Sequence, residues 1–121
     1  MMTKRLGIVC AVAMLFVAPL GWAASDTTPA QIRKELDQFD GKVVTLLGTM
    51  TSLDVRVSRR GNSYYTFDLS AGGWSIKVFS FGRPPCRDGS IVIVEGVFQQ
   101  VKRVSGRTFY NEVEAQRVSC R

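Results

Sequence analysis

Apolar and polar residues alternate along much of this chain, and one alternating phrase occurs twice. Both copies read Gly-x-x-Φ-x-Φ-x-Gly-x-Φ, in which Φ is apolar, and they run from Gly41 to Met50 and from Gly89 to Phe98. A period of two is the mark of a half-buried β-strand. A glycine inside such a strand usually marks a bulge or a tight bend. The repeat therefore predicts two strongly bent strands in a small, highly curved sheet.

The same two-residue period predicts five strands in all, over residues 42–57, 64–69, 74–79, 91–101 and 108–118. The segment Ala71-Gly72-Gly73 is a tight turn, so the second and third strands are expected to form a hairpin. Trp74 is expected to face inward together with Ile76 and Val78. The alternation assigns ten side chains to the interior: Val44, Leu46, Phe67, Leu69, Ile76, Val78, Val92, Val94, Phe98 and Val113.

Residues 24–40 are predicted to hold one short helix that covers an end of the sheet. Thr28 can cap its first turn, Pro29 suits the first helical position, and Asp40-Gly41 ends it. Three apolar residues fall on one side of this helix, at spacings of four and three: Ile32, Leu36 and Phe39.

Residues 1–23 have the features of a secretory signal peptide. Lys4 and Arg5 are followed by an uncharged, mostly apolar run over residues 6–20, and Gly21 and Ala23 precede the expected cleavage site. The apolar run is short for a membrane span of about 20 residues. We therefore expect a periplasmic or secreted protein with no stable span after cleavage, and the alternative is an uncleaved anchor.

Two cysteines remain after cleavage, Cys86 and Cys120. An even number of cysteines in an exported chain indicates a disulfide. The functional alternative is a redox pair, but no Cys-x-x-Cys spacing supports it.

Composition argues against catalysis. The chain contains no histidine, which removes the commonest general base and a common metal ligand. Glu112 and Glu114 lie two residues apart and are interpreted as a solvated strand face, and Gly72-Gly73 is a hairpin turn and not a phosphate-binding loop. We expect no enzyme activity, no cofactor and no metal.

The net charge of the mature chain is only moderately basic. The full chain carries +6, and removing Lys4 and Arg5 leaves 14 basic and 10 acidic residues, a net charge of +4. This charge permits only weak attraction to polyanions.

Three segments give the chain a resemblance to the OB-fold nucleic-acid-binding family: GKVVTLLGTM, YYTFDLSAGGWSIKVF and GSIVIVEGVF. The resemblance covers residues 41–118 and implies a mainly β domain over residues 41–121, a five-stranded, partly open Greek-key barrel. It departs from many members of the family in one respect, because RPPCRDG cannot form a helix between the third and fourth strands. The short N-terminal helix is expected to fill that end instead.

The resemblance also implies a binding face on the second and third strands, flanked by the first and fourth turns. Cations gather at both turns, and aromatic rings lie on the face between them, where rings stack on bases and cations track phosphates. Tyr110 on the last strand extends the predicted platform. The candidate nucleic-acid-binding residues are Arg56, Arg59, Arg60, Tyr64, Lys77, Phe79, Lys102, Arg103 and Arg107. The alternative is that basic turns only keep the protein soluble and keep sheet edges apart.

Two functions from different classes follow. The first is an exported OB-fold module that binds single-stranded DNA or RNA, or another polyanion, with little sequence preference. The second is a periplasmic protein-interaction or stress-tolerance module that uses the same barrel to hold an envelope protein or a small ligand. The paired basic turns favour the first, whereas export favours the second because nucleic acid is scarcer outside the cytoplasm.

Overall fold

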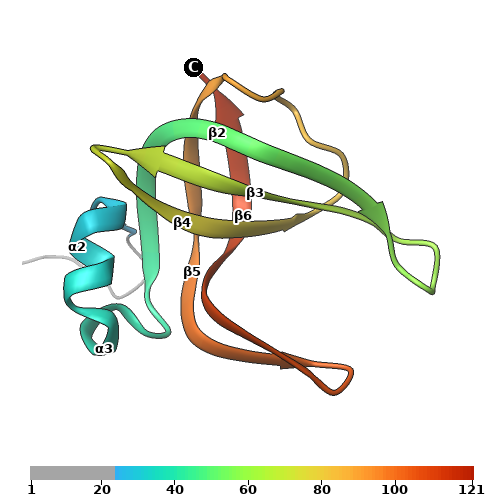
Figure 1. Cartoon of the computed structure of the whole chain (residues 1–121), viewed down its shortest axis with the longest axis horizontal. Helices are drawn as coiled ribbons and strands as arrows, with labels where there is room; N and C mark the ends of the chain where they lie inside the picture. The colour runs from blue at the N-terminus through green and yellow to red at the C-terminus, as the bar shows by residue number, and fades with distance from the viewer. Residues whose placement is uncertain (1–23) are drawn as a thin grey trace, which may run out of the picture.

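Strands make up most of residues 24–121, which are the residues that the computed structural model describes; the predicted signal peptide at residues 1–23 lies outside them. Two short helices precede the five long strands (Figure 1). The elements in chain order are β1 (Ser25–Asp26), α2 (Pro29–Lys34), α3 (Leu36–Phe39), β2 (Val43–Val57), β3 (Ser63–Ala71), β4 (Trp74–Phe81), β5 (Ile91–Val104) and β6 (Arg107–Cys120).

The sheet has six strands in the order β1-β2-β3-β4-β6-β5, and β2 also pairs with β5. The five long strands therefore each have a neighbour on both sides, and the pairings return to β2. The prediction of five strands was incomplete, because Ser25–Asp26 adds a two-residue strand parallel to the start of β2. A strand this short contains no alternation that a sequence pattern could reveal.

The two copies of the repeated phrase lie side by side in antiparallel β2 and β5. Leu46 pairs with Val94 at the centre, and the second glycine of each copy pairs with a valine of the other, Gly48 with Val92 and Gly96 with Val44. A Cβ atom on Gly48 would lie 2.6 Å from the Ser70 carbonyl oxygen. The missing side chains thus allow a third strand to approach each of these glycines closely, β3 at Gly48 and β6 at Gly96.

The predicted bends at the two glycines are confirmed for only one of them. The register of β5 against β6 shifts between Glu95 and Gly96, as the repeat predicted. In β2 the shift against β3 lies between Thr51 and Asp54, beyond Gly48. Ser52 within that shift adopts a positive φ of 54°, so a serine and not the glycine provides the irregular backbone there.

The interior follows the alternation closely. All ten side chains predicted to point inward are buried, with exposed fractions of 2% or less. They are joined in the core by Ile32, Met50, Tyr65 and Ala115. Trp74 was also expected to face inward, and that prediction was wrong. It begins β4 beside the Gly72-Gly73 turn, and its side chain is 45% exposed.

The predicted N-terminal helix forms as two short helices separated at Glu35. Thr28 caps the first through its hydroxyl oxygen, which accepts a hydrogen bond of 3.1 Å from the Gln31 backbone N–H. Ile32 is fully buried in the core, and Leu36 and Phe39 pack against it. The helices lie on the side of the molecule opposite the tips of the β2–β3 and β5–β6 hairpins (Figure 1). Within residues 24–121, no helix is long and apolar enough to cross a membrane.

Candidate functional site

The outer face of β3, β4 and β6 carries its side chains in ordered rows. The β3–β4 hairpin sets Tyr64 opposite Phe81, Thr66 opposite Phe79, and Asp68 opposite Lys77. β6 then continues two of these rows, because Glu114 pairs with Phe79 and Glu112 pairs with Lys77. Aromatic side chains therefore lie at the end of this face near the turn between β2 and β3, and charged side chains lie further along the strands.

Three aromatic rings form one cluster on this face. The Tyr64 and Phe79 rings are stacked with centroids 5.3 Å apart, and the Phe81 ring stands edge-on to Phe79 at 5.0 Å. Phe79 is only partly exposed, whereas Phe81 is 65% exposed. The ring that is open to a ligand is therefore that of Phe81. The predicted platform residue Phe79 packs against that ring.

Lys102 completes the cluster from the β5–β6 hairpin. Its Nζ lies 4.0 Å from the centroid of the Phe79 ring, in cation–π geometry. The same Nζ donates a hydrogen bond of 2.7 Å to Glu112 and lies 3.8 Å from Glu114. The Lys102 side chain is only 12% exposed, and that of Glu112 is 6% exposed. Lys102 was predicted as a ligand-binding cation and Glu112 as a solvated carboxylate. In the structure the two side chains instead form a largely buried ion pair with each other.

Phe109 extends the cluster, and Tyr110 does not. Lys102 pairs with Phe109 across the hairpin, and its Nζ lies 5.9 Å from that ring centroid. Tyr110 pairs with Val101 instead, on the opposite face of the hairpin, because successive side chains on a strand point to opposite sides. We refer to Tyr64, Phe79, Phe81 and Phe109 as the aromatic face.

Two further predicted cations are also paired with carboxylates. Lys77 lies 3.0 Å from Asp68 across the β3–β4 hairpin. Arg56 Nε lies 2.8 Å from Asp54, and this hydrogen bond and ion pair raise the pKa of Arg56 above its usual value. Both pairs are well exposed, so their net attraction is small and a ligand can compete for the cations.

The remaining four predicted cations form no ion pair within residues 24–121: Arg59, Arg60, Arg103 and Arg107. The first two lie in the turn between β2 and β3, and the last two lie beside the turn between β5 and β6. Both hairpin tips project toward the same side of the molecule (Figure 1). Arg107 also lies over the Phe109 ring, with its guanidinium carbon 5.7 Å from the centroid. The structure thus separates the predicted cations into two groups. Three are paired with carboxylates on or near the face, and four lie at the tips of the β2–β3 and β5–β6 hairpins with no ion pair to a described residue.

Cys86 and Cys120 form a disulfide with Cα atoms 5.7 Å apart, which is the predicted pairing. It joins the irregular segment after β4 to the end of β6. Because β6 also carries Glu112 and Glu114, the bridge anchors the strand that fixes Lys102.

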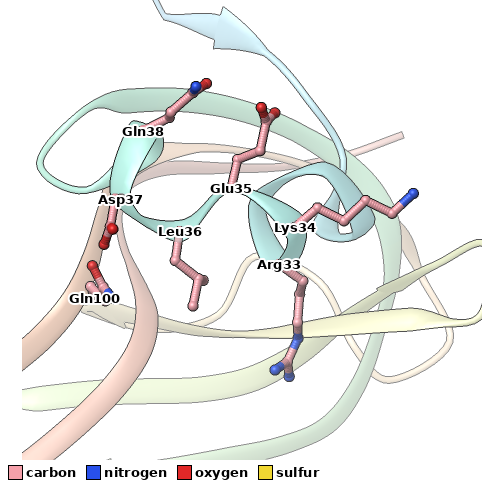
Figure 2. A pocket seen from close by; sticks show the side chains of 7 residues that line it. All are labelled: Arg33, Lys34, Glu35, Leu36, Asp37, Gln38 and Gln100. Atoms are coloured by element: carbon pink, nitrogen blue, oxygen red, sulfur yellow. The ribbon is translucent and has the colours of Figure 1, made fainter.

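The hollows on the surface lie elsewhere. One is lined by residues of α2, Glu35, α3 and β5, where Figure 2 shows Glu35 and Gln38 pointing to one side of the helices and Arg33 to the other. Its charges are of both signs, and Arg33 is tied by a hydrogen bond of 3.2 Å to the Ser75 carbonyl oxygen. A second hollow is lined by residues 26–27, 45–47, Ile93 and Arg121. Neither includes a residue of the aromatic face. Residues 24–121 contain no group of three or more His, Cys, Asp or Glu side chains that could hold a metal ion.

Comparison with known proteins rests on structure alone, because no protein-family model and no curated protein matches the chain. The crystal structure of yeast Stn1 and Ten1 contains a similar chain, with a TM-score of 0.64 and 12% identity over 82% of this chain and 64% of that one. The OB domain of Ta0387 from Thermoplasma acidophilum has a TM-score of 0.52 and 19% identity over 80% of this chain and 87% of that domain.

The chain has the OB-fold. A putative aspartyl-tRNA synthetase from Leishmania major Friedlin is also similar, with a TM-score of 0.58 and 12% identity over 89% of this chain. This chain spans only 23% of that synthetase and 64% of the yeast chain. At such low identities the similarity establishes the fold alone, and the binding function must be argued from the face itself.

Proposed function

We propose that the chain is an exported OB-fold binding module for single-stranded nucleic acid, with little sequence preference. In this proposal the ring of strand pairings is a Greek-key barrel whose outer face on β3, β4 and β6 is the binding surface. One observation carries the proposal: the exposed ring of Phe81 lies on an aromatic face, and arginines that form no ion pair with any described residue stand beside it at the tips of the β2–β3 and β5–β6 hairpins.

The division of charge favours nucleic acid over a uniformly charged polyanion. The face itself holds Lys77 and Lys102 against three carboxylates, those of Asp68, Glu112 and Glu114, so it carries one net negative charge. A sulfated polysaccharide laid across this face would meet repulsion at its centre and has no aromatic ring to stack on Phe81. A single strand can place its bases on the rings and its phosphates at the arginines, because its charged and aromatic parts are separate.

The similar solved structures are compatible with this proposal, but they do not identify the ligand. One of the similar structures is named as an aspartyl-tRNA synthetase, an enzyme that by its name acts on an RNA. OB-folds bind oligonucleotides and oligosaccharides alike, so the name of a neighbour does not select between them.

Export is the second part of the proposal, and the N-terminal sequence supports it. The measurement that tests it is the intact mass of protein recovered from the periplasm or the medium. A mass equal to residues 24–121 with the disulfide formed supports cleavage after Ala23, and a mass of the full chain in the membrane fraction supports the anchor instead.

The binding part is tested by titrating the mature protein against labelled single-stranded DNA, single-stranded RNA and heparin at two salt concentrations. We expect both single strands to bind more tightly than heparin at matched ionic strength, and both to weaken as salt increases. Equal or tighter binding of heparin would contradict the role given to the rings. No binding to any of the three at low salt would reject the proposal.

A protein-interaction or stress-tolerance module, holding an envelope protein or a small ligand, is the second candidate, and exposed apolar side chains favour it. Val55 and Val57 near the end of β2 are 55% and 66% exposed, and Tyr110 on the other hairpin is 67% exposed. Such side chains suit a partner that is not a polyanion. This candidate becomes the better account if the titration shows no polyanion binding.

A further inference from the structure

Among the three carboxylates on the proposed binding face, Glu114 is the most exposed and the least engaged by a cation. Glu112 is almost fully buried and is held by Lys102 at 2.7 Å, and Asp68 is held by Lys77 at 3.0 Å. Glu114 is 40% exposed, and the one ion pair it makes among the described residues is a loose contact of 3.8 Å with Lys102.

Glu114 also lies in the same row of the sheet as a ring of the aromatic face. It pairs with Phe79 across the β4–β6 ladder, while Asp68 and Glu112 flank Lys77 one row further away. The exposed Phe81 ring is 5.0 Å from that of Phe79. A base that stacks on this cluster therefore meets the Glu114 carboxylate at its edge. On the other side of Phe79 is Thr66, whose hydroxyl can both donate and accept and so does not discriminate between bases.

We propose that Glu114 reads the edge of one base and favours a base with an exocyclic amino group over thymine. This inference rests on the proposed function and deepens it, since it sets the preference at one position of an otherwise permissive strand. An ionised carboxylate only accepts hydrogen bonds. The N4 amino group of cytosine donates to it, whereas thymine has the O4 oxygen at that position, and its one edge donor, N3–H, lies between two carbonyl oxygens that repel a carboxylate.

Cytosine and thymine make the sharpest comparison because they are both pyrimidines and stack with similar area. The probes are labelled oligo(dC) and oligo(dT) of about 12 nucleotides, within the range of site sizes of single OB-folds. We expect oligo(dC) to bind about tenfold more tightly than oligo(dT), the effect of one hydrogen bond to a charged group. Glu114→Gln should bring the ratio of the two dissociation constants close to one, because the amide can donate to thymine O4 as well as accept from cytosine N4.

The matched control is Glu95→Gln, which removes the same charge from β5, where Glu95 pairs with Thr45 and Arg117 away from the aromatic face. Both variants should strengthen binding slightly through net charge, but only Glu114→Gln should change the ratio. A wild-type ratio near one, or a ratio that Glu114→Gln leaves unchanged, would overturn the inference while leaving the proposed function intact. No binding of either probe to the wild-type protein would instead reject the proposed function.

Discussion

Lys102 Nζ lies 4.0 Å from the centre of the Phe79 ring, and this contact links β5 to β4, two strands that are separated by β6 in the sheet. Lys102 belongs to the β5–β6 hairpin and Phe79 to the β3–β4 hairpin. The ammonium group is desolvated there, and Glu112 compensates for that loss through a 2.7 Å hydrogen bond. Lys102 therefore positions one wall of the aromatic face and is not available to a phosphate.

The first prediction concerns this buried pair. Lys102→Met leaves the Glu112 carboxylate with no cation in a place where it is poorly solvated, and the free energy of unfolding should fall by about 3 kcal/mol. The double variant Lys102→Met/Glu112→Leu removes both charges and should recover most of that loss. Urea denaturation of the two variants measures the difference. A loss below about 0.5 kcal/mol for Lys102→Met would mean that the pair behaves as an ordinary surface ion pair.

The second prediction concerns Gly96 at the bend of β5. A Cβ atom there would collide with the Glu114 carbonyl oxygen and lie 2.6 Å from Ala115 Cα, both of which are backbone atoms of β6. Gly96→Ala should therefore cost about 2–3 kcal/mol through displacement of β6.

Gly106→Ala is the matched control for that variant. Gly106 has a φ of +79° in the turn between β5 and β6, but nothing lies within 4 Å of its added Cβ. Its substitution should cost only the left-handed backbone strain, about 1 kcal/mol. Equal losses for the two variants in thermal or urea denaturation would show that close packing at Gly96 is not what bends the strand.

The third prediction concerns the disulfide. Cys86 and Cys120 are 34 residues apart in sequence, and closing a loop of that length stabilises a fold by about 3–4 kcal/mol in the chain-entropy model. Replacing both cysteines with serine should lower the melting temperature of the oxidised protein to near that of the reduced wild type. Two reactive thiols in protein purified without reductant would contradict the pairing.

Much of the fold could be predicted from the sequence because burial here follows a strict period of two. Phe67 and Val78 sit opposite each other inside the sheet, and the alternation around the Gly72-Gly73 turn was enough to place both. The irregular positions could not be predicted in this way. Ser52 carries the bulge in β2, although nothing in its chemistry distinguishes it from other strand serines.

The candidate site was only partly predictable because its pairings cross between distant strands. Arg59 and Arg60 were found from local charge, and they remain available in the structure. The burial of Lys102 against Glu112 depends on the hairpin register, which residue types alone do not fix. The third strand was predicted to end at residue 79, which left Phe81 outside it. Continued alternation from Phe79 would have placed Phe81 on the same face, and this was the signal that could have found it.

The fourth prediction concerns the hairpin-tip arginines. Each phosphate contact with a single strand adds about −0.7 to the slope of log affinity against log salt, so two to four contacts give a slope of about −1.4 to −2.8. Charge reversal of Arg59 and Arg60 to glutamate should flatten that slope by about 1.4 if both contact phosphates. Reversal of Lys34 and Lys42, exposed residues near the helices, changes net charge equally and should leave the slope nearly intact. Equal flattening by both pairs of substitutions would mean that the protein attracts the strand only through its net charge.

The last prediction separates stacking from charge. Phe81→Ala removes the most exposed ring of the aromatic face, and loss of one stacked base costs about 1–3 kcal/mol, or about 5- to 150-fold in affinity. The salt slope should stay the same, because a phenyl ring releases no counterions. Tyr110→Ala is the matched control, since Tyr110 is 67% exposed and Phe81 is 65% exposed, but Tyr110 points to the other side of its hairpin. Both substitutions remove an exposed ring and should change stability little, so a difference in affinity reports the ligand contact. If Tyr110→Ala weakens single-strand binding as much as Phe81→Ala does, the ligand does not lie on the face built by β3, β4 and β6.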